Sequence, residues 1–328
     1  MQTITVFSTQ PYDSESLTHW GCGQYNWHFV SQKLDTLTAA QATGSAAICV
    51  FVNDDLSAPV LDTLAALGIK TIVLRCAGYN NVDIAHAKQL GFQLARVPAY
   101  SPEAVAEHCI AMILCLNRKL HKAYNRVRDD NFSLDGLMGF NLHGKTVGII
   151  GTGRIGLTTA KILAGFGCNV LCVDPQPQAT LPSAQCRYVE LNELYQQADI
   201  ISLHCPLTPD TFHMINPQSL ALMKPGVMLI NTSRGGLIDT KAVIEGLKSK
   251  LIGFLGLDVY EQEADLFFKD LSDHVIADEV FQRLLTFPNV LITGHQAFFT
   301  AEALAQIGQI TCANLQALLH NQPCANSL

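Results

Sequence analysis

Short apolar runs of strand length alternate with helix-length stretches through most of this 328-residue chain. In the first hundred residues, helical stretches at Ala58–Leu67 and Val82–Leu90 separate the apolar runs. This alternation predicts a parallel sheet with crossover helices. The strands predicted in this region are Ile4–Ser8, Ala47–Val52, Thr71–Arg75 and Gln93–Val97.

The same alternation starts again after position 100, so two open α/β lobes are predicted. Ser101, Pro102 and Glu103 are typical of a helix start: a Ser N-cap, Pro at the first helical position and an acid near the positive dipole end. We expect this helix to end near Arg118 and a final helix to cover Ala301–Leu319; both could connect the lobes. A further helix is predicted at about 154–165. The strands predicted here are Thr146–Ile150, Asn169–Val173, Ile200–His204, Val227–Asn231, Phe254–Val259 and Val290–Thr293. A chain of this length suits two domains.

Composition narrows the class of protein. A net charge of −7 with scattered basic residues argues against nucleic acid or an anionic membrane as the main partner. We find no apolar run long enough to span a membrane, and the first residues resemble a strand rather than a secretory signal. The eleven cysteines include no C-x-x-C pair, which favours buried, reduced thiols in a cytoplasmic protein without a metal site.

The most specific local pattern is a glycine turn in mid-chain, Gly151-Thr152-Gly153-Arg154-Ile155-Gly156. A predicted strand precedes it, a predicted helix follows, and Asp174 ends the next strand 18 residues after Gly156. Gly151 permits the tight turn, Gly153 lets the backbone approach a pyrophosphate, and Gly156 allows close helix–sheet packing. Asp174 would accept hydrogen bonds from the adenosine ribose and repel a 2′-phosphate. The pattern predicts an NAD site, in preference to NADP.

Two more loops follow predicted strands of the same lobe, Cys205-Pro206 and Thr232-Ser233. Ligands of open α/β sheets bind at the carboxyl ends of the strands, so we expect these loops beside the nicotinamide half of the cofactor. His204 either faces the nicotinamide as well or is a structural histidine at a strand end.

Charged groups follow three successive predicted strands and should converge on one crevice. Arg234 has a planar fork that matches a carboxylate, and His295 has the side-chain type that exchanges protons near neutral pH. Glu263 would hydrogen-bond the imidazole, fix its tautomer and keep it protonated, and Asp258 would be a second carboxylate near the histidine or the nicotinamide. These groups suit reduction of a 2-keto acid by hydride transfer. Each one alone also fits a structural or surface role.

Several blocks, which together extend over nearly the whole chain, resemble the D-2-hydroxyacid dehydrogenase family. Tyr100 and Gly294–Phe298 are most similar to bacterial fermentative members of that family. The other similar blocks are Leu74–Asp83, Val97–Pro102, Asn231–Gly235 and Asp258–Glu261.

The resemblance implies two doubly wound parallel-sheet lobes with a cleft between them. Residues 1–100 and 298–328 would form a flavodoxin-like substrate domain, and residues 101–297 a Rossmann-type NAD domain. Arg234 would bind substrate, His295 would donate the proton and Glu263 would assist it. The other residues implied in substrate binding are Ala77, Gly78, Tyr100 and Phe298. Those implied in NAD binding are Gly151, Gly153, Arg154, Ile155, Gly156, Asp174, Cys205, Pro206, Thr211, Thr232, Ser233 and Asp258.

The implied reaction is the reduction of pyruvate by NADH to D-lactate, in a homo-oligomer that is a dimer or a tetramer. Two alternatives stay open. One is a bulkier 2-keto acid as substrate, although Tyr100 and Phe298 suggest a small pocket. The other is an NAD-sensing binding protein without turnover, because transcriptional corepressors share this fold and similar site residues.

Overall fold

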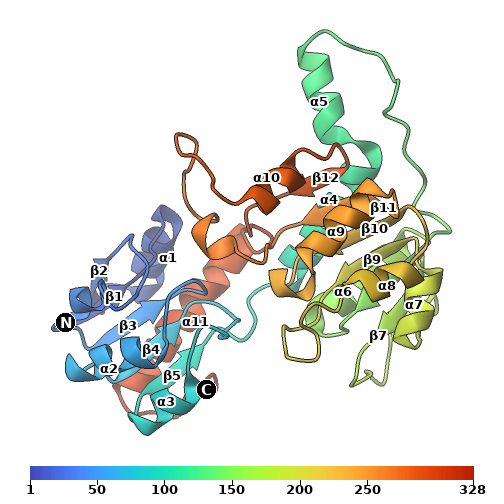
Figure 1. Cartoon of the computed structure of the whole chain (residues 1–328). Helices are drawn as coiled ribbons and strands as arrows, with labels where there is room; N and C mark the ends of the chain where they lie inside the picture. The colour runs from blue at the N-terminus through green and yellow to red at the C-terminus, as the bar shows by residue number, and fades with distance from the viewer. The chain divides into compact units, whose positions relative to one another are not determined.

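The computed structural model of the chain divides into two compact units (Figure 1). Unit 1 comprises Met1–Ser101 and Phe299–Leu328, and unit 2 comprises Pro102–Phe298. Each boundary lies one residue later than the sequence analysis placed it. The structure describes the backbone of all 328 residues and the side chains of residues 1–264 and 266–328.

Unit 1 is built on a five-stranded sheet with the order β2-β1-β3-β4-β5, and each neighbouring pair is parallel. Successive strands are added on one side of β1 up to β2 and on its other side from β3 onward, so a topological switch point lies at the carboxyl ends of β1 and β3. Its strands are β1 (Gln2–Val6), β2 (Tyr25–Phe29), β3 (Ala47–Val50), β4 (Thr71–Leu74) and β5 (Gln93–Arg96). Its helices are α1 (Pro11–Gly21), η1 (Ala39–Ala42), α2 (Ala58–Ala66), α3 (Ile84–Gln89) and α11 (Ala301–Leu319).

Helices cover both faces of this sheet. Leu17 of α1 and Leu315 of α11 pack with Ile4 on one face, and α2 and α3 form a second apolar cluster on the other. A Cβ on Gly308 of α11 would lie 2.4 Å from Ser16 Oγ, so α1 and α11 are in close contact. The last helix is therefore part of the wall of unit 1.

Unit 2 contains a seven-stranded sheet with the order β12-β11-β10-β9-β6-β7-β8, again with each neighbouring pair parallel. The switch point lies between β6 and β9. Its strands are β6 (Thr146–Ile150), β7 (Asn169–Val173), β8 (Cys186–Tyr188), β9 (Ile200–Leu203), β10 (Val227–Asn231), β11 (Ile252–Leu257) and β12 (Val290–Ile292). Its helices are α4 (Pro102–Arg118), α5 (Leu120–Arg128), α6 (Arg154–Gly165), α7 (Leu191–Gln197), α8 (Pro217–Leu222), η2 (Gly235–Leu237), α9 (Thr240–Lys248), η3 (Glu263–Asp265) and α10 (Glu279–Leu285).

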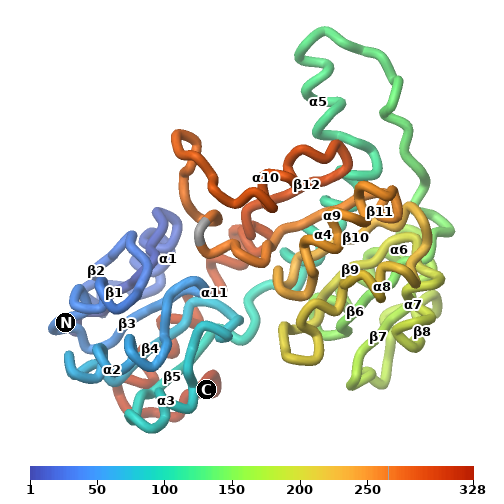
Figure 2. The backbone as a smooth tube through the Cα atoms, in the orientation of Figure 1, coloured from blue at the N-terminus to red at the C-terminus, as the bar shows by residue number. Residues whose placement is uncertain are grey.

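Two apolar clusters lie on opposite faces of this sheet. On one face, α4 and α6 pack against β6, β7 and β10; on the other, α7, α8, α9 and α10 pack against the same strands and β11. Helix α5 buries none of its residues, and Figures 1 and 2 show it standing apart from the sheet, with a long connection back to β6. Within the described residues, no helix is both long enough and apolar enough to span a membrane.

The structure confirms the predicted fold class of two parallel-sheet α/β lobes. Three predicted strands, Thr146–Ile150, Asn169–Val173 and Val227–Asn231, have the predicted bounds. Five others end one or two residues earlier than predicted, and the strands expected at Ile4–Ser8 and Phe254–Val259 lie two residues earlier, at Gln2–Val6 and Ile252–Leu257. The sequence analysis missed β2, β8 and several short helices. The edge strand β8 has three residues, too few to show a period, and α5 has only nine, whose large apolar side chains are exposed and not buried in a core.

Candidate active site

The glycine turn connects β6 to α6 with the tight geometry that its sequence predicts. Gly151 has φ +95°, and a Cβ there would lie 2.6 Å from the Cys205 nitrogen. A Cβ on Gly156 would lie 2.0 Å from the Gly151 carbonyl oxygen, whereas one on Gly153 would meet nothing within 4 Å. Gly151 and Gly156 are thus required for packing. Gly153 leaves open space in front of the helix start, where Arg154 is exposed and Ile155 half-buried.

Asp174 follows β7, the strand beside β6, and is tied to the glycine turn. Its carboxylate accepts hydrogen bonds from the Thr152 amide at 2.6 Å and the Gln176 amide at 2.8 Å. The Tyr188 hydroxyl hydrogen-bonds Thr152 Oγ1 at 2.9 Å. These contacts hold a half-buried carboxylate beside the glycine turn, and its contact with the ribose stays a prediction. Sequence reasoning missed Tyr188, which lies in the short strand β8.

The loops after β9 and β10 are joined to each other. Ser233 Oγ donates to the Cys205 carbonyl at 2.7 Å, and Thr211 Oγ1 closes its own loop by donating to the Pro206 carbonyl at 2.7 Å. Thr232 is 7% exposed, and within the described residues its hydroxyl has no hydrogen-bond partner. Buried hydroxyls normally have a partner, so a bound ligand or water would complete this one.

His204 directly follows β9, and its side chain hydrogen-bonds a residue of that strand. Its Nε2 lies 2.9 Å from Ser202 Oγ, and burial lowers the pKa of His204 to about 4. The imidazole is therefore neutral at physiological pH. This geometry favours the structural interpretation of His204 over a contact with the cofactor.

Arg234 stands on a turn that directly follows β10. Buried Asn231 holds the turn by donating from Nδ2 to the Arg234 carbonyl at 2.8 Å and accepting from the Ser233 amide at 3.0 Å. The guanidinium is half-buried and donates to the Ser233 carbonyl at 2.7 Å. Among the described side chains no carboxylate forms an ion pair with it, so its charge is available to an anionic ligand.

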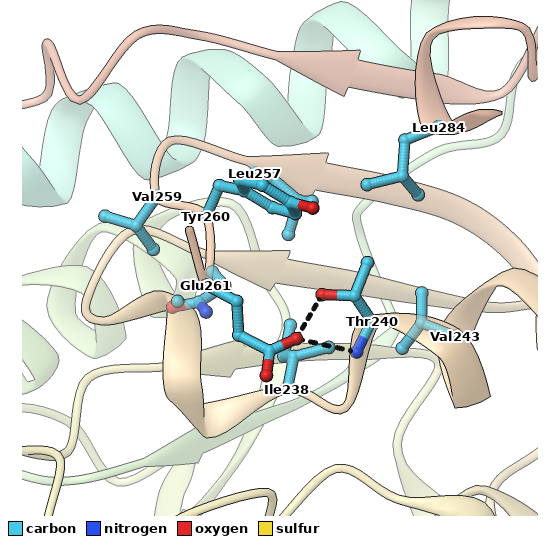
Figure 3. Close-up of a pocket in the computed structure, with 10 residues that line it drawn as sticks. Ile238, Thr240, Val243, Leu257, Val259, Tyr260, Glu261 and Leu284 are labelled. Carbon is cyan, nitrogen blue, oxygen red and sulfur yellow. Dashed lines mark hydrogen bonds between the residues drawn. The ribbon is translucent and has the colours of Figure 1, made fainter. Parts of the chain in front are cut away.

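The Arg234 turn packs directly on the segment that follows β11. A Cβ on Gly235 would lie 2.1 Å from the Tyr260 carbonyl carbon, so a larger residue cannot replace this glycine without moving the turn. Figure 3 shows the Glu261 carboxylate bonded to the amide and hydroxyl of Thr240, at 3.2 and 2.7 Å. Glu261 also lies 2.6 Å from His213 Nε2. The space between these groups, about 10 Å³, fits one water, so it is a packing gap and not a substrate pocket.

His295 and Glu263 form a close pair at the carboxyl ends of β12 and β11. His295 Nδ1 lies 2.8 Å from Glu263 Oε1, and the two side chains are 17% and 16% exposed. The other carboxylate oxygen of Glu263 accepts from the Tyr260 amide at 3.1 Å. Because Nδ1 is engaged, Nε2 is the ring atom left for a substrate. The structure thus brings together the two residues that the sequence analysis paired.

Asp258 directly follows β11, is completely buried, and accepts from the His295 amide through its carbonyl at 2.8 Å. Its carboxylate accepts hydrogen bonds from Thr293 Oγ1 at 2.5 Å and from the amides of Gln296 and Ala297 at 2.9 Å each. Burial, the largest influence, raises the pKa of Asp258, but the bonds from His108, Thr293 and the two amides outweigh it and lower the pKa. Asp258 is near the histidine, as expected, and its NAD contact stays a prediction.

The other predicted substrate residues are distributed over both units. Ala77 and Gly78 follow β4 in unit 1, where Arg96 donates to the Ala77 carbonyl at 2.6 Å. Tyr100 is half-buried in unit 1, and Phe298 is 7% exposed at the end of unit 2. Their roles stay predictions. In the described part of the chain no group of three or more His, Cys, Asp or Glu is arranged to hold a metal ion.

Comparisons with known proteins show the family to which the chain belongs. Residues 110–297 match the family model described as D-isomer specific 2-hydroxyacid dehydrogenase, NAD binding domain. The chain is 52% identical over 326 residues to D-lactate dehydrogenase of Escherichia coli (strain K12), and the alignment covers 99% of each.

Two solved structures are similar over nearly the full length. The pyruvate reductase of Chlamydomonas reinhardtii has a TM-score of 0.93 at 44% identity, with 99% of this chain and 98% of that chain covered. D-lactate dehydrogenase from Aquifex aeolicus, solved in complex with NAD and lactic acid, has a TM-score of 0.87 at 34% identity, with 97% and 96% covered.

Proposed function

Because the chain belongs to the D-isomer specific 2-hydroxyacid dehydrogenase family, we propose that it interconverts pyruvate and D-lactate with NAD as cofactor. The observation that carries the proposal is the arrangement at the edge of β10, β11 and β12. These strands are neighbours in one parallel sheet, so the groups after them share one edge. The Arg234 guanidinium, which forms no ion pair with a carboxylate among the described side chains, and the pair of His295 with Glu263 are the groups that reduction of a 2-keto acid needs.

The residues of the dinucleotide site fit NAD. The open space at Gly153, the carboxylate of Asp174 and the hydroxyl of Thr232 lie at the carboxyl ends of β6, β7 and β10. That hydroxyl has no hydrogen-bond partner among the described residues. A carboxylate at Asp174 suits the ribose hydroxyls of NAD and repels a 2′-phosphate. Bound NADH would supply a hydride to C2 of the keto acid.

The protein residues hold and protonate the substrate. Arg234 binds the carboxylate of pyruvate and polarises its carbonyl group. His295 Nε2 donates a proton to the carbonyl oxygen as the alkoxide develops, and in the reverse direction it removes that proton. Glu263 accepts from Nδ1, which fixes the ring orientation and stabilises the imidazolium.

The experiment is NADH oxidation with a panel of 2-keto acids of increasing size, followed by chiral analysis of the product. We expect rapid turnover of pyruvate and formation of D-lactate only. Fast turnover of phenyl- or branched-chain keto acids alone would keep the chemistry and replace the substrate. Binding of NADH without turnover of any keto acid would contradict enzymatic function and favour an NAD-sensing protein.

We also propose that the chain forms a homo-oligomer. Leu120, Tyr124 and Val127 lie on one face of α5 and are 55%, 63% and 52% exposed. Apolar side chains gathered on one surface in this way are typical of protein–protein contacts. Sedimentation velocity on the wild type and on Tyr124→Lys tests this, because the charge should shift the chain toward the monomer. A monomeric wild type would contradict it.

We also propose a cytoplasmic location, on the basis of the thiols. All eleven cysteines are free, and eight of them are buried. Reduced cysteines in this number suit a reducing compartment, so we place the protein in the cytoplasm. Fractionation of the native host, with detection of the chain, tests this placement.

A further inference from the structure

His108 lies in the middle of helix α4 and contacts the two segments that surround the His295 loop in unit 2. Its Nε2 lies 3.1 Å from Thr293 Oγ1 and 3.4 Å from Asp258 Oδ1. The His108 side chain is 18% exposed and the Asp258 side chain 0%. Thr293 directly follows β12 and Asp258 directly follows β11, so this histidine connects a helix to both strand ends.

The direction of these hydrogen bonds follows from the number of available protons. Asp258 is a carboxylate and can only accept, so the hydroxyl proton of Thr293 is committed to Asp258 Oδ1 at 2.5 Å. Thr293 Oγ1 must then accept from His108, which requires a hydrogen on Nε2. The three residues therefore form a directed chain, from His108 through Thr293 to Asp258.

Asp258 connects this series of hydrogen bonds to the backbone around His295. Its carboxylate accepts from the amides of Gln296 and Ala297, and its carbonyl accepts from the His295 amide at 2.8 Å. His295 has φ +54°, a conformation that non-glycine residues adopt only when surrounding contacts impose it. The loop thus depends on the orientation of one carboxylate, which His108 and Thr293 hold in place.

We propose that His108 is a positioning residue for the reaction, which acts on His295 through Thr293 and Asp258. This inference rests on the proposed function, because it assigns His295 as the proton donor. His108 does not act on substrate in this role. It keeps the loop in the one conformation in which Glu263 holds Nδ1 and Nε2 is presented for proton transfer. A displacement of a catalytic group by about 1 Å is enough to slow a reaction about 100-fold.

The test compares three variants with the wild type. His108→Leu removes the donor and keeps the bulk, and we expect kcat for pyruvate reduction to fall about 10- to 100-fold. KM for pyruvate should change less than about twofold, because Arg234 is untouched. His108→Gln keeps an N–H donor near the position of Nε2 and should restore kcat to within about threefold of the wild type. Thr293→Val breaks the chain without a change of shape and should resemble His108→Leu.

A second measurement follows the loop itself and does not depend on turnover. Amide hydrogen exchange of a peptide that contains residues 295–298 should be faster in His108→Leu and in Thr293→Val than in the wild type. The matched control is His86→Leu on α3 of unit 1. His86 is also partly exposed, and its Nε2 lies 2.8 Å from Asp62 Oδ1. This control should leave both the exchange and kcat unchanged.

The outcomes separate this inference from the proposed function. An unchanged kcat in His108→Leu, unchanged loop exchange, or failure of His108→Gln to restore activity would each overturn the positioning role. A wild type that turns over no 2-keto acid would overturn the proposed function, and loop exchange would then decide alone whether His108 holds the loop.

Discussion

The carboxyl edge of the unit 2 sheet has two functional parts, the cofactor edge and the chemical edge, and they are built in different ways. At the cofactor edge, formed by β6, α6 and β7, a backbone amide donates to a side-chain carboxylate: Thr152 and Asp174 are 22 residues apart. At the chemical edge, the loops after β10, β11 and β12, side chains meet across larger separations. His295 and Glu263 are 32 residues apart, and His108 and Thr293 are 185 apart.

This difference predicts that substitutions at the cofactor edge and at the chemical edge impair different steps, NADH binding and hydride transfer. The cofactor edge depends on the absence of side chains at Gly151 and Gly156, and a substitution there changes the space itself. The chemical edge depends on oriented side chains in a preformed sheet. Loss of one of those side chains should therefore reduce the rate of the chemical step while NADH binding survives.

The largest effect is expected for His295→Gln. The variant loses the general acid, so kcat for pyruvate reduction should fall about 10²- to 10⁴-fold. NADH binding, followed by fluorescence titration, should be the same as in the wild type. A variant that kept nearly full turnover would contradict the assignment of His295.

Arg234→Gln should have the next largest effect. The variant loses the guanidinium that holds the carboxylate and polarises the carbonyl, so kcat/KM for pyruvate should fall about 10²- to 10³-fold. Steady-state kinetics check this value, and Arg187→Gln, at an exposed salt bridge with Glu193, serves as the control. Comparable losses in both variants would show that charge at Arg234 has no specific role.

Asp174→Asn tests the cofactor edge. Loss of the charged acceptor should weaken NADH binding about tenfold, the scale of one hydrogen bond to an ionised group. The ratio of NADPH to NADH affinity should rise, because the repulsion of a 2′-phosphate is removed. Titration with both cofactors measures this ratio, and an unaltered preference would mean that Asp174 does not face the ribose.

Glu263→Gln should have the smallest effect of the four. The Glu263 carboxylate accepts from His295 Nδ1 and orients the ring, so its replacement by an amide should lower kcat for pyruvate reduction about three- to tenfold. The Kd of NADH should stay the same as in the wild type. Steady-state kinetics and NADH titration measure both values, and an unchanged kcat would mean that Glu263 does not orient His295.

The contrast between the edges also explains what sequence reasoning found. The glycine turn, Asp174 and the strand-end positions of Arg234, Glu263 and His295 were predicted from local spacing. His108 was missed as a functional residue, although it carried a signal: with Glu107 it interrupts the apolar run of its helix, and a largely buried polar side chain normally has a partner. Nothing in the order of residues indicated that this partner lies 185 positions away.

Sequence alone determined the β-α alternation, the class of the fold and the residue types that suit a dehydrogenase, because periodicity and turn chemistry act over short distances along the chain. Tertiary structure alone decided that Asp258 faces inward to three donors, that Glu261 ties Thr240 and His213 together, and that His108 reaches the His295 loop. These pairings depend on strand order and on how a helix packs against its sheet. Both are set by the burial of apolar faces in three dimensions, for which neighbouring residues carry no local pattern.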